Sequence, residues 1–176
     1  PLVRRQIGGV MERLRGLYAG QPGEAAFSAY ALETLKPMLI RIGWNIGAGE
    51  AANVSLLRTG LIGALSRLGD EETIAEARRR FAAAQTDPKA MPPALRGAIL
   101  GAVGRAADQA AWDDLKAKAV AAKSPLEQRQ FLGAMAAAKD PALAKQGLEY
   151  FLTDAVPKQL APGLIGGVTG THPDLG

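Results

Sequence analysis

Two arginines occupy equivalent positions in a repeated sequence pattern. Arg58 and Arg96 each follow a leucine, and each lies 12 residues before an aspartate, Asp70 or Asp108. A guanidinium group binds a carboxylate through two parallel hydrogen bonds, so an arginine here could anchor a peptide carboxylate on a concave helical face. The alternative is structural, with the guanidinium tying one repeat to the next. Arg58 and Arg96 are therefore candidate substrate-chamber residues, and both roles stay open.

The other polar residues do not form a recognisable catalytic or metal site. The sequence has one histidine, His172, and no cysteine, and it contains no HExxH motif. One histidine without a cysteine cannot build a typical zinc site, and no serine is paired with a base. Adjacent carboxylates such as Asp113 and Asp114 lie at expected helix starts, where capping and the helix dipole explain them. We predict no catalytic residue, no metal site and no cofactor in this chain.

A short apolar pattern with a central glycine recurs along the chain. Each copy has two large apolar residues, a glycine, a small residue and a further apolar residue, and an aspartate follows. The copies begin at Leu61, Ile99, Phe131 and Leu164, and their glycines are Gly63, Gly101, Gly133 and Gly166. A period of 32 to 38 residues is typical of an α-solenoid. Because glycine costs about 1 kcal/mol in a helix, we expect neighbouring helices to pack closely at these glycines.

The sequence predicts an all-α fold, an α-α superhelix of HEAT-like helical hairpins in a single domain over 1–176. The predicted helical pairs cover about 54–84, 92–122 and 124–153, and a partial copy covers 156–176. Four polar residues are expected to cap helices, because their oxygens can accept hydrogen bonds from free N–H groups of the first turn. These expected caps are Asp70, Asp108, Ser124 and Asp140.

The segment before the repeats predicts two further helices, over 2–18 and 24–42. Pro37 lies inside the second helix, and proline removes one backbone hydrogen bond. We therefore expect a kink or an early stop near Leu35. The chain contains two tryptophans, Trp44 and Trp112, and both are interpreted as core residues.

Composition excludes several classes of protein. The 21 basic and 17 acidic residues give a net charge of +4, and the run from Arg78 to Arg80 is interpreted as a solvated helix end. No basic stripe alternates with aromatic residues, so we expect no nucleic-acid partner. We also expect no membrane span, because no apolar run is long enough. The start of the chain shows no signal-peptide pattern, and a cytoplasmic location is the expectation, although the lack of cysteine leaves the compartment open.

The two ends of the sequence suggest a piece of a longer protein. The chain begins with Pro1, and it ends at Gly176 where a further repeat is expected to continue. Solenoids need capping repeats, so an unfinished end exposes an apolar helix face. Self-association of the isolated chain is therefore a further expectation.

Several short segments resemble one family of enzymes. In chain order they are Gly43-Trp44, Gly49-Glu50, Leu56-Leu57-Arg58, Leu61-Ile62, Ala75–Phe81, Pro93–Arg96, Trp112–Leu115, Ser124–Gln128 and Lys139–Leu143. Their order and spacing over about residues 40–175 resemble the C-terminal domain of zinc aminopeptidases of the puromycin-sensitive and endoplasmic-reticulum types.

The resemblance implies a non-catalytic role for this chain. In that family a separate catalytic domain carries an exopeptidase motif and HExxH, and neither occurs here. The C-terminal domain is a bowl of HEAT-like repeats that closes over the active site and limits which peptides enter. The resemblance thus implies a parent chain that binds zinc in its catalytic domain, with that domain and peptide substrates as partners. The alternatives are a stand-alone HEAT-like scaffold that binds a protein on its concave face, and a solenoid that binds nucleic acid.

Overall fold

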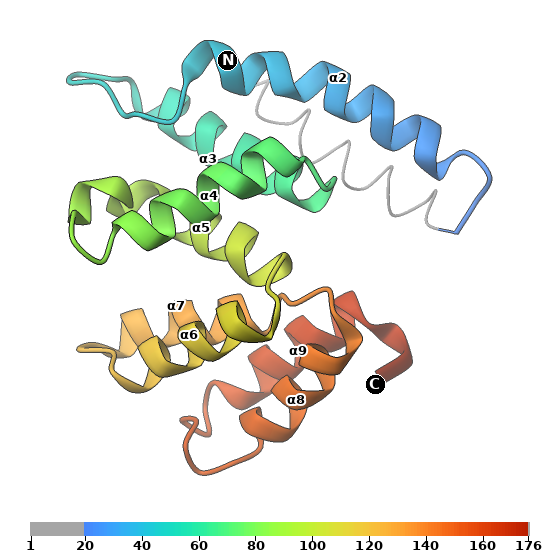
Figure 1. Ribbon diagram of the computed structural model, residues 1–176, viewed down its shortest axis with the longest axis vertical. Helices are drawn as coiled ribbons and strands as arrows, with labels where there is room; N and C mark the ends of the chain where they lie inside the picture. The colour runs from blue at the N-terminus through green and yellow to red at the C-terminus, as the bar shows by residue number, and fades with distance from the viewer. Residues whose placement is uncertain (1–19, 176) are drawn as a thin grey trace. The chain divides into compact units, whose positions relative to one another are not determined.

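The computed structural model describes residues 20–175, and every regular element in that range is helical (Figure 1). The α-helices are α2 (Glu24–Ile42), α3 (Ala52–Arg67), α4 (Glu71–Ala83), α5 (Pro93–Arg105), α6 (Gln109–Val120), α7 (Pro125–Met135), α8 (Pro141–Phe151) and α9 (Ala161–Thr171). Two short 3-10 helices, η1 (Pro88–Ala90) and η2 (Pro173–Leu175), complete the described part. The predicted all-α fold is confirmed. The helix expected over 2–18 lies outside the described residues.

The helices follow the predicted pairs closely. α3 and α4 fall in the pair expected at 54–84, α5 and α6 in 92–122, and α7 and α8 in 124–153, while α9 falls in the partial copy. The chain divides into two compact units, Pro1–Ile99 and Leu100–Gly176, with the boundary inside α5. The single domain over 1–176 stays a prediction, and the two units are described separately.

Each helix expected to carry a polar cap begins at the expected residue. Asp70 accepts a hydrogen bond from the Thr73 backbone N–H, and Asp108, Ser124 and Asp140 make equivalent bonds at the starts of α6, α7 and α8. Gly69 ends the preceding segment with φ of 83°, a left-handed conformation that glycine adopts without strain. Local sequence therefore determines where these helices begin.

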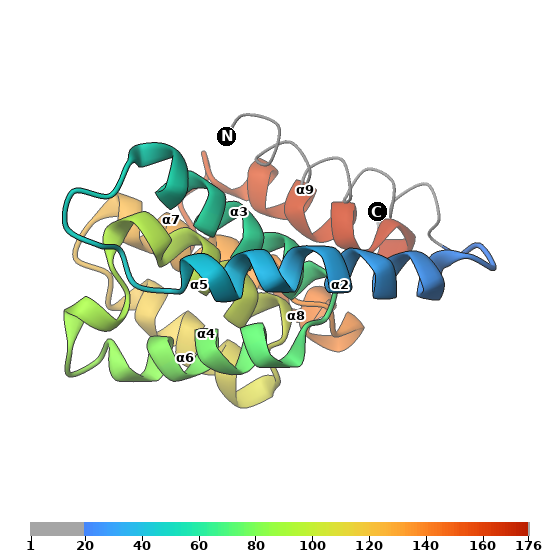
Figure 2. The same cartoon turned by 90° about the horizontal axis from the view of Figure 1, so that it is seen from above.

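The first unit is built around α3. Figure 2 shows α2 lying along α3, and α4 also packs against α3. The buried apolar residues of this unit are Ala31, Leu35, Leu39, Leu61, Ile62, Ala64, Leu65, Ala77, Phe81, Met91, Leu95 and Ile99. Among the described residues of this unit, the core is aliphatic apart from Phe81 and Met91.

The α2 helix covers the predicted range 24–42 and continues through Pro37, so of the two expected alternatives the early stop near Leu35 does not occur. Leu35 and Leu39 lie on either side of the proline and are both buried, so tertiary packing holds the helix on both sides. Pro37 and Glu33 are exposed, so water can bind the Glu33 carbonyl that loses its helical partner.

The second unit contains one very close approach between helices. A Cβ added to Gly104 of α5 would lie 1.9 Å from the backbone oxygen of Ala134 in α7. The recurring glycines do not play this role. Within the described residues, a Cβ at Gly101, Gly133 or Gly166 would meet no atom within 4 Å. The expectation of close packing at these glycines is wrong, because the packing face of α5 carries Gly104, one turn further on.

The rest of the second unit packs in helical pairs. α6 packs on α7, α8 on α9, and α7 also contacts α9. The largest buried side chains include Trp112, Phe151, Leu115, Leu132 and Met135. His172 is also buried, and its Nε2 lies 2.9 Å from the carbonyl oxygen of Ala138. This contact fixes the end of α9 to the turn between α7 and α8.

Candidate functional site

The connector between α2 and α3 is fixed by Arg58, the first candidate residue. Its guanidinium donates to both carboxylate oxygens of Glu50 at 2.6 Å, to the Gly43 carbonyl at 2.7 Å and to the Ile42 carbonyl at 3.2 Å. The Arg58 residue is 0% exposed. The hydrogen bonds from Arg58 hold the pKa of Glu50 below its usual value. These contacts support the structural alternative, and a substrate role for Arg58 stays a prediction.

A second arginine fixes the same connector from α4. Arg80 donates to the Asn45 side-chain oxygen at 2.9 Å, and its guanidinium carbon lies 5.3 Å from the centre of the Trp44 ring. It also donates to the carboxylate of Glu76 at 2.7 Å and to the Ala90 carbonyl at 3.3 Å. Arg80 is buried, so its interpretation as part of a solvated helix end is wrong, while Arg78 and Arg79 are exposed as expected.

Arg58 and Arg80 together fix the position of Trp44. Gly43 ends α2 with φ of 65°, and its carbonyl is bound by Arg58, so the chain direction at Trp44 is fixed on one side. Arg80 fixes the ring on the other side. Trp44 is half-buried, which differs from the expected core role, whereas Trp112 is fully buried as expected.

A lysine six residues before the end of α2 joins this helix to the start of α4. Lys36 Nζ lies 2.8 Å from a Glu72 oxygen and 3.2 Å from an Asp70 oxygen. The hydrogen bond that Lys36 donates to Glu72, followed by the one that it donates to Asp70, raises the pKa of Lys36. Burial alone would raise the pKa of Asp70, but hydrogen bonds from Thr73 and Lys36 outweigh it and lower that pKa. Both groups therefore keep their charge near neutral pH.

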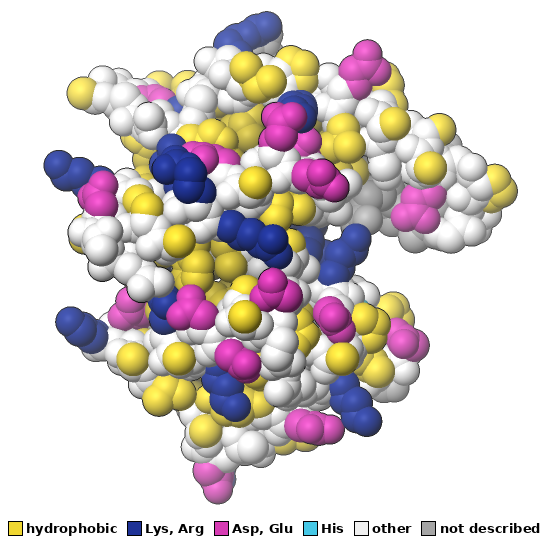
Figure 3. All heavy atoms as spheres, viewed as in Figure 1, with side chains coloured by type: hydrophobic (Ala, Val, Ile, Leu, Met, Phe, Trp, Pro, Cys, Tyr) yellow, Lys and Arg dark blue, Asp and Glu magenta, His cyan; other side chains and the backbone are white. Residues whose placement is uncertain are grey.

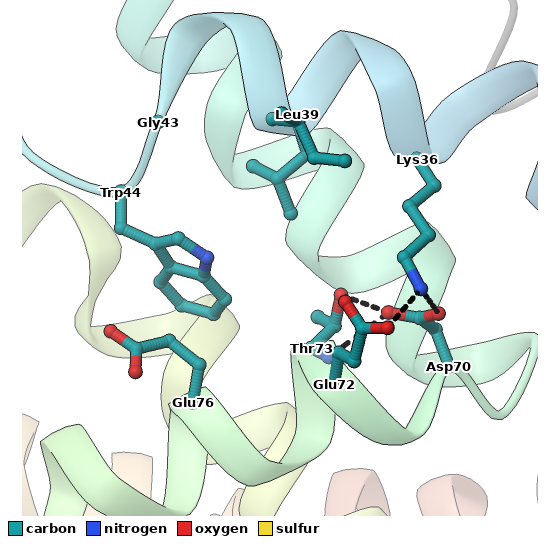
Figure 4. A pocket seen from close by; sticks show the side chains of 9 residues that line it. Lys36, Leu39, Gly43, Trp44, Asp70, Glu72, Thr73 and Glu76 are labelled. Atoms are coloured by element: carbon teal, nitrogen blue, oxygen red, sulfur yellow. Dashed lines mark hydrogen bonds and ion pairs between the residues drawn. The ribbon is translucent and has the colours of Figure 1, made fainter.

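Trp44, Lys36 and the acidic partners of Lys36 line a cavity of about 320 Å³ in the first unit (Figure 4). Its lining residues are Lys36, Leu39 and Ile40 of α2, Gly43 and Trp44 of the connector, and Asp70, Glu72, Thr73 and Glu76 at the start of α4. Figure 4 shows Trp44 and Glu76 at one end and Lys36 with its acidic partners at the other, with Leu39 between them. We call this cavity the α2–α4 groove.

Glu76, like Asp70, has a lowered pKa in the α2–α4 groove. Hydrogen bonds from Arg79, together with those from Arg80, lower the pKa of Glu76. Arg79 donates to both oxygens of Glu76, at 2.6 and 2.7 Å. Sequence reasoning missed this site because its members are far apart in the chain. The only local signal was the spacing of Glu76 from Arg79 and Arg80, three and four residues on.

The second unit has a cavity of about 450 Å³ beside the start of α9. Its lining residues are Arg129 and Gly133 of α7 together with Gln159, Leu160, Gly163 and Leu164. Arg129 is exposed, and α9 begins without a side-chain cap. The second candidate residue, Arg96, lies half-buried on α5. Neither Arg58 nor Arg96 lines either of the two cavities.

Between residues 20 and 175, no group of three or more His, Asp or Glu side chains is placed to hold a metal ion. No helix in that range is long and apolar enough to cross a bilayer. Acidic and basic side chains alternate over the face seen in Figure 3, and the net charge is +4.

Comparison with known proteins places the chain in a family. The sequence profile of ERAP1-like C-terminal domains matches residues 1–175. Aminopeptidase M1-A of Oryza sativa subsp. japonica is 30% identical over 155 residues, which is 85% of this chain and 18% of the relative. Aminopeptidase M1 of Arabidopsis thaliana is 31% identical over 134 residues, or 73% of this chain and 15% of the relative.

A second rice relative gives the same result. Aminopeptidase M1-B of Oryza sativa subsp. japonica is 32% identical over 133 residues, again 73% of this chain and 15% of the relative. The chain thus spans less than a fifth of the length of the aminopeptidases that it matches. The profile match, the identities and the all-helical structure agree, and the chain belongs to the family of ERAP1-like C-terminal domains of aminopeptidases.

Proposed function

We propose that this chain is the non-catalytic C-terminal segment of a zinc-dependent aminopeptidase, an enzyme that removes N-terminal residues from peptides. In this proposal its helical pairs form a bowl that covers the active site and restricts peptide access. The family match over residues 1–175, with relatives named as aminopeptidases, is the observation that carries the proposal.

The side-chain chemistry of the chain agrees with a non-catalytic role. The residues do not fit a zinc site, because the only histidine, His172, contacts the Ala138 carbonyl and the chain has no cysteine. In the proposal, zinc is held by the catalytic domain of the parent chain, which is also the main partner of this segment. The chain would then contribute walls and binding groups to a chamber, without chemical steps of its own.

The two candidate arginines differ in how well they suit a role in substrate binding. Arg58 donates four hydrogen bonds to Glu50 and to backbone carbonyls, which supports a role in holding the connector. Arg96 is half-buried and remains the candidate for binding a peptide carboxylate. In the parent enzyme, Arg96→Ala should raise the KM for peptides with a free C-terminus and leave the KM for C-terminally amidated peptides unchanged. If Arg96→Ala leaves the KM for peptides with a free C-terminus unchanged, Arg96 does not bind the peptide carboxylate.

The first experiment is to isolate the natural polypeptide that contains this sequence and to measure its mass and zinc content. A chain several times heavier than 18.4 kDa with about one zinc per chain supports the proposal. A natural chain near 18.4 kDa without zinc contradicts it. That second result favours the alternative, a helical scaffold that binds a protein partner.

A further inference from the structure

We propose that the α2–α4 groove binds a lysine or arginine side chain presented by a peptide segment. This proposal goes beyond the function proposed above. The groove lies within the first unit, so binding of a peptide to it can be measured on this chain alone. The result does not depend on whether the chain restricts access to an active site.

The size and walls of the groove suit one long side chain. A volume of about 320 Å³ lies at the lower end of the range for small-molecule sites, roughly 300–1,000 Å³. Leu39, Ile40 and Trp44 form its apolar part. The methylene stem of a lysine or arginine packs on apolar and aromatic surfaces of this kind while its charged head reaches a polar group.

The walls of the groove are held before any ligand arrives. Trp44 is fixed by Arg80 and by the bonds from Arg58 to the Gly43 carbonyl. At the other end, Lys36 is fixed by two acidic partners. A preformed site binds with less loss of conformational entropy than a site that must become ordered.

The charges at the Lys36 end of the groove favour a cation over an anion. At the other end, Glu76 is bound by both Arg79 and Arg80, so no negative charge is in excess there. The other two lining carboxylates, Asp70 and Glu72, share a single counter-ion, Lys36. One negative charge is therefore in excess at the Lys36 end, and the Glu72 side chain is 78% exposed and within reach of an incoming cation.

An exposed apolar residue beside the groove indicates a peptide rather than a free amine. Ile40 lines the groove and is 71% exposed. Burying the Ile40 side chain stabilises a complex, and a neighbouring apolar peptide residue can cover it whereas a free amine cannot. The expected ligand thus has a basic residue flanked by apolar residues.

The experiment is a titration of the ¹⁵N-labelled chain, followed by the indole N–H signals in a ¹H–¹⁵N correlation spectrum. The chain has two tryptophans, so two indole signals are expected, and Trp44→Phe assigns them. The probes are acetyl-Leu-Lys-Leu-amide and its arginine analogue, with norleucine and glutamate analogues as controls. We expect a saturable shift of the Trp44 signal with the lysine and arginine peptides, and no shift of the Trp112 signal.

Two charge variants and a matched control test the role of Glu72. Glu72→Gln should weaken binding of the lysine peptide about threefold, as expected for one exposed ion pair. Lys36→Met removes the internal competitor and should strengthen binding by a similar factor. Glu71→Gln changes the charge at the next position of the same helix, outside the groove, and should leave the affinity unchanged.

Three results would overturn the proposal. They are an absence of any Trp44 shift at millimolar peptide, equal binding of the norleucine or glutamate peptide, and equal affinities of Glu72→Gln and Glu71→Gln. The spectra of the free variants show whether each is folded. If Lys36→Met does not fold, Glu72→Gln and the peptide analogues still decide between the outcomes.

Discussion

Arg58 and Glu50 form a two-point ion pair in the interior of the first unit, with both N–O distances at 2.6 Å. The same guanidinium binds the carbonyls of Ile42 and Gly43, where α2 ends. One side chain of α3 therefore fixes both ends of the connector that carries Trp44. This relationship links the stability of the first unit to the geometry of the α2–α4 groove.

We predict that Arg58→Ala destabilises the first unit by about 1–3 kcal/mol or more, because it removes a fully buried side chain and leaves two backbone carbonyls and the Glu50 carboxylate without their partner. Urea unfolding, with amide hydrogen exchange to locate the loss, measures the effect. Arg41→Ala is the control, since Arg41 is exposed at the end of α2 and its removal should cost no more than about 0.5 kcal/mol. A similar small cost for both variants would contradict the structural role of Arg58.

Two glycines three residues apart on α5 should respond in opposite directions to alanine. Gly104→Ala should destabilise the second unit by about 1–3 kcal/mol or more, because the new methyl group would overlap the Ala134 backbone. Gly101→Ala should stabilise it by about 0.5–1 kcal/mol, because the added methyl group meets no atom within 4 Å and the unfolded chain loses entropy. Chemical unfolding of both variants provides the test. Changes of the same sign in the free energy of unfolding would contradict the close approach of α5 to α7 at Gly104.

The stability of the first unit should fall in acid. Asp70 has a pKa below its ordinary value of 3.8, so its ionised form is stabilised in the folded state. That contribution is fully present above the unfolded pKa of about 3.8 and is lost as the pH falls through the lower folded value. Glu76 acts in the same direction, from an ordinary pKa of 4.5.

Asp70→Asn isolates this effect, because asparagine keeps the helix cap but cannot ionise. The free energies of unfolding of the variant and the original chain should differ by about 1 kcal/mol at pH 7 and converge towards pH 3. Unfolding curves between pH 3 and pH 7 make the comparison. A difference that stays constant over this range would contradict the pKa shift of Asp70.

The sequence was sufficient for those features that depend on local interactions. Asp70, Asp108, Ser124 and Asp140 each accept bonds from residues two or three positions ahead, so their positions could be predicted from neighbouring residues. The apolar stripes likewise defined the helical pairs. The fate of Pro37 was not predictable locally, because buried Leu35 and Leu39 hold the helix together across it.

The groove depends on contacts between residues far apart in the sequence, which the sequence pattern does not predict. Arg80 and Asn45 are 35 residues apart in the chain and 2.9 Å apart in space. Lys36 and Asp70 are similarly distant in sequence and form an ion pair. Helix-dipole reasoning explained Arg80 as an exposed residue. Besides Glu76 of the same helix, its partners lie in two other segments, Asn45 in the connector and Ala90 in η1.

The most direct test of a role in peptide access compares the parent enzyme with a version that lacks this segment. The measurement is the ratio of kcat/KM for a nine-residue peptide to that for an aminoacyl-4-nitroanilide, a substrate too small to be excluded by a chamber wall. We predict that the ratio changes when the segment is removed and returns when the separate 176-residue chain is added back. An unchanged ratio, with zinc still bound and the small substrate still cleaved, would contradict a role in peptide access.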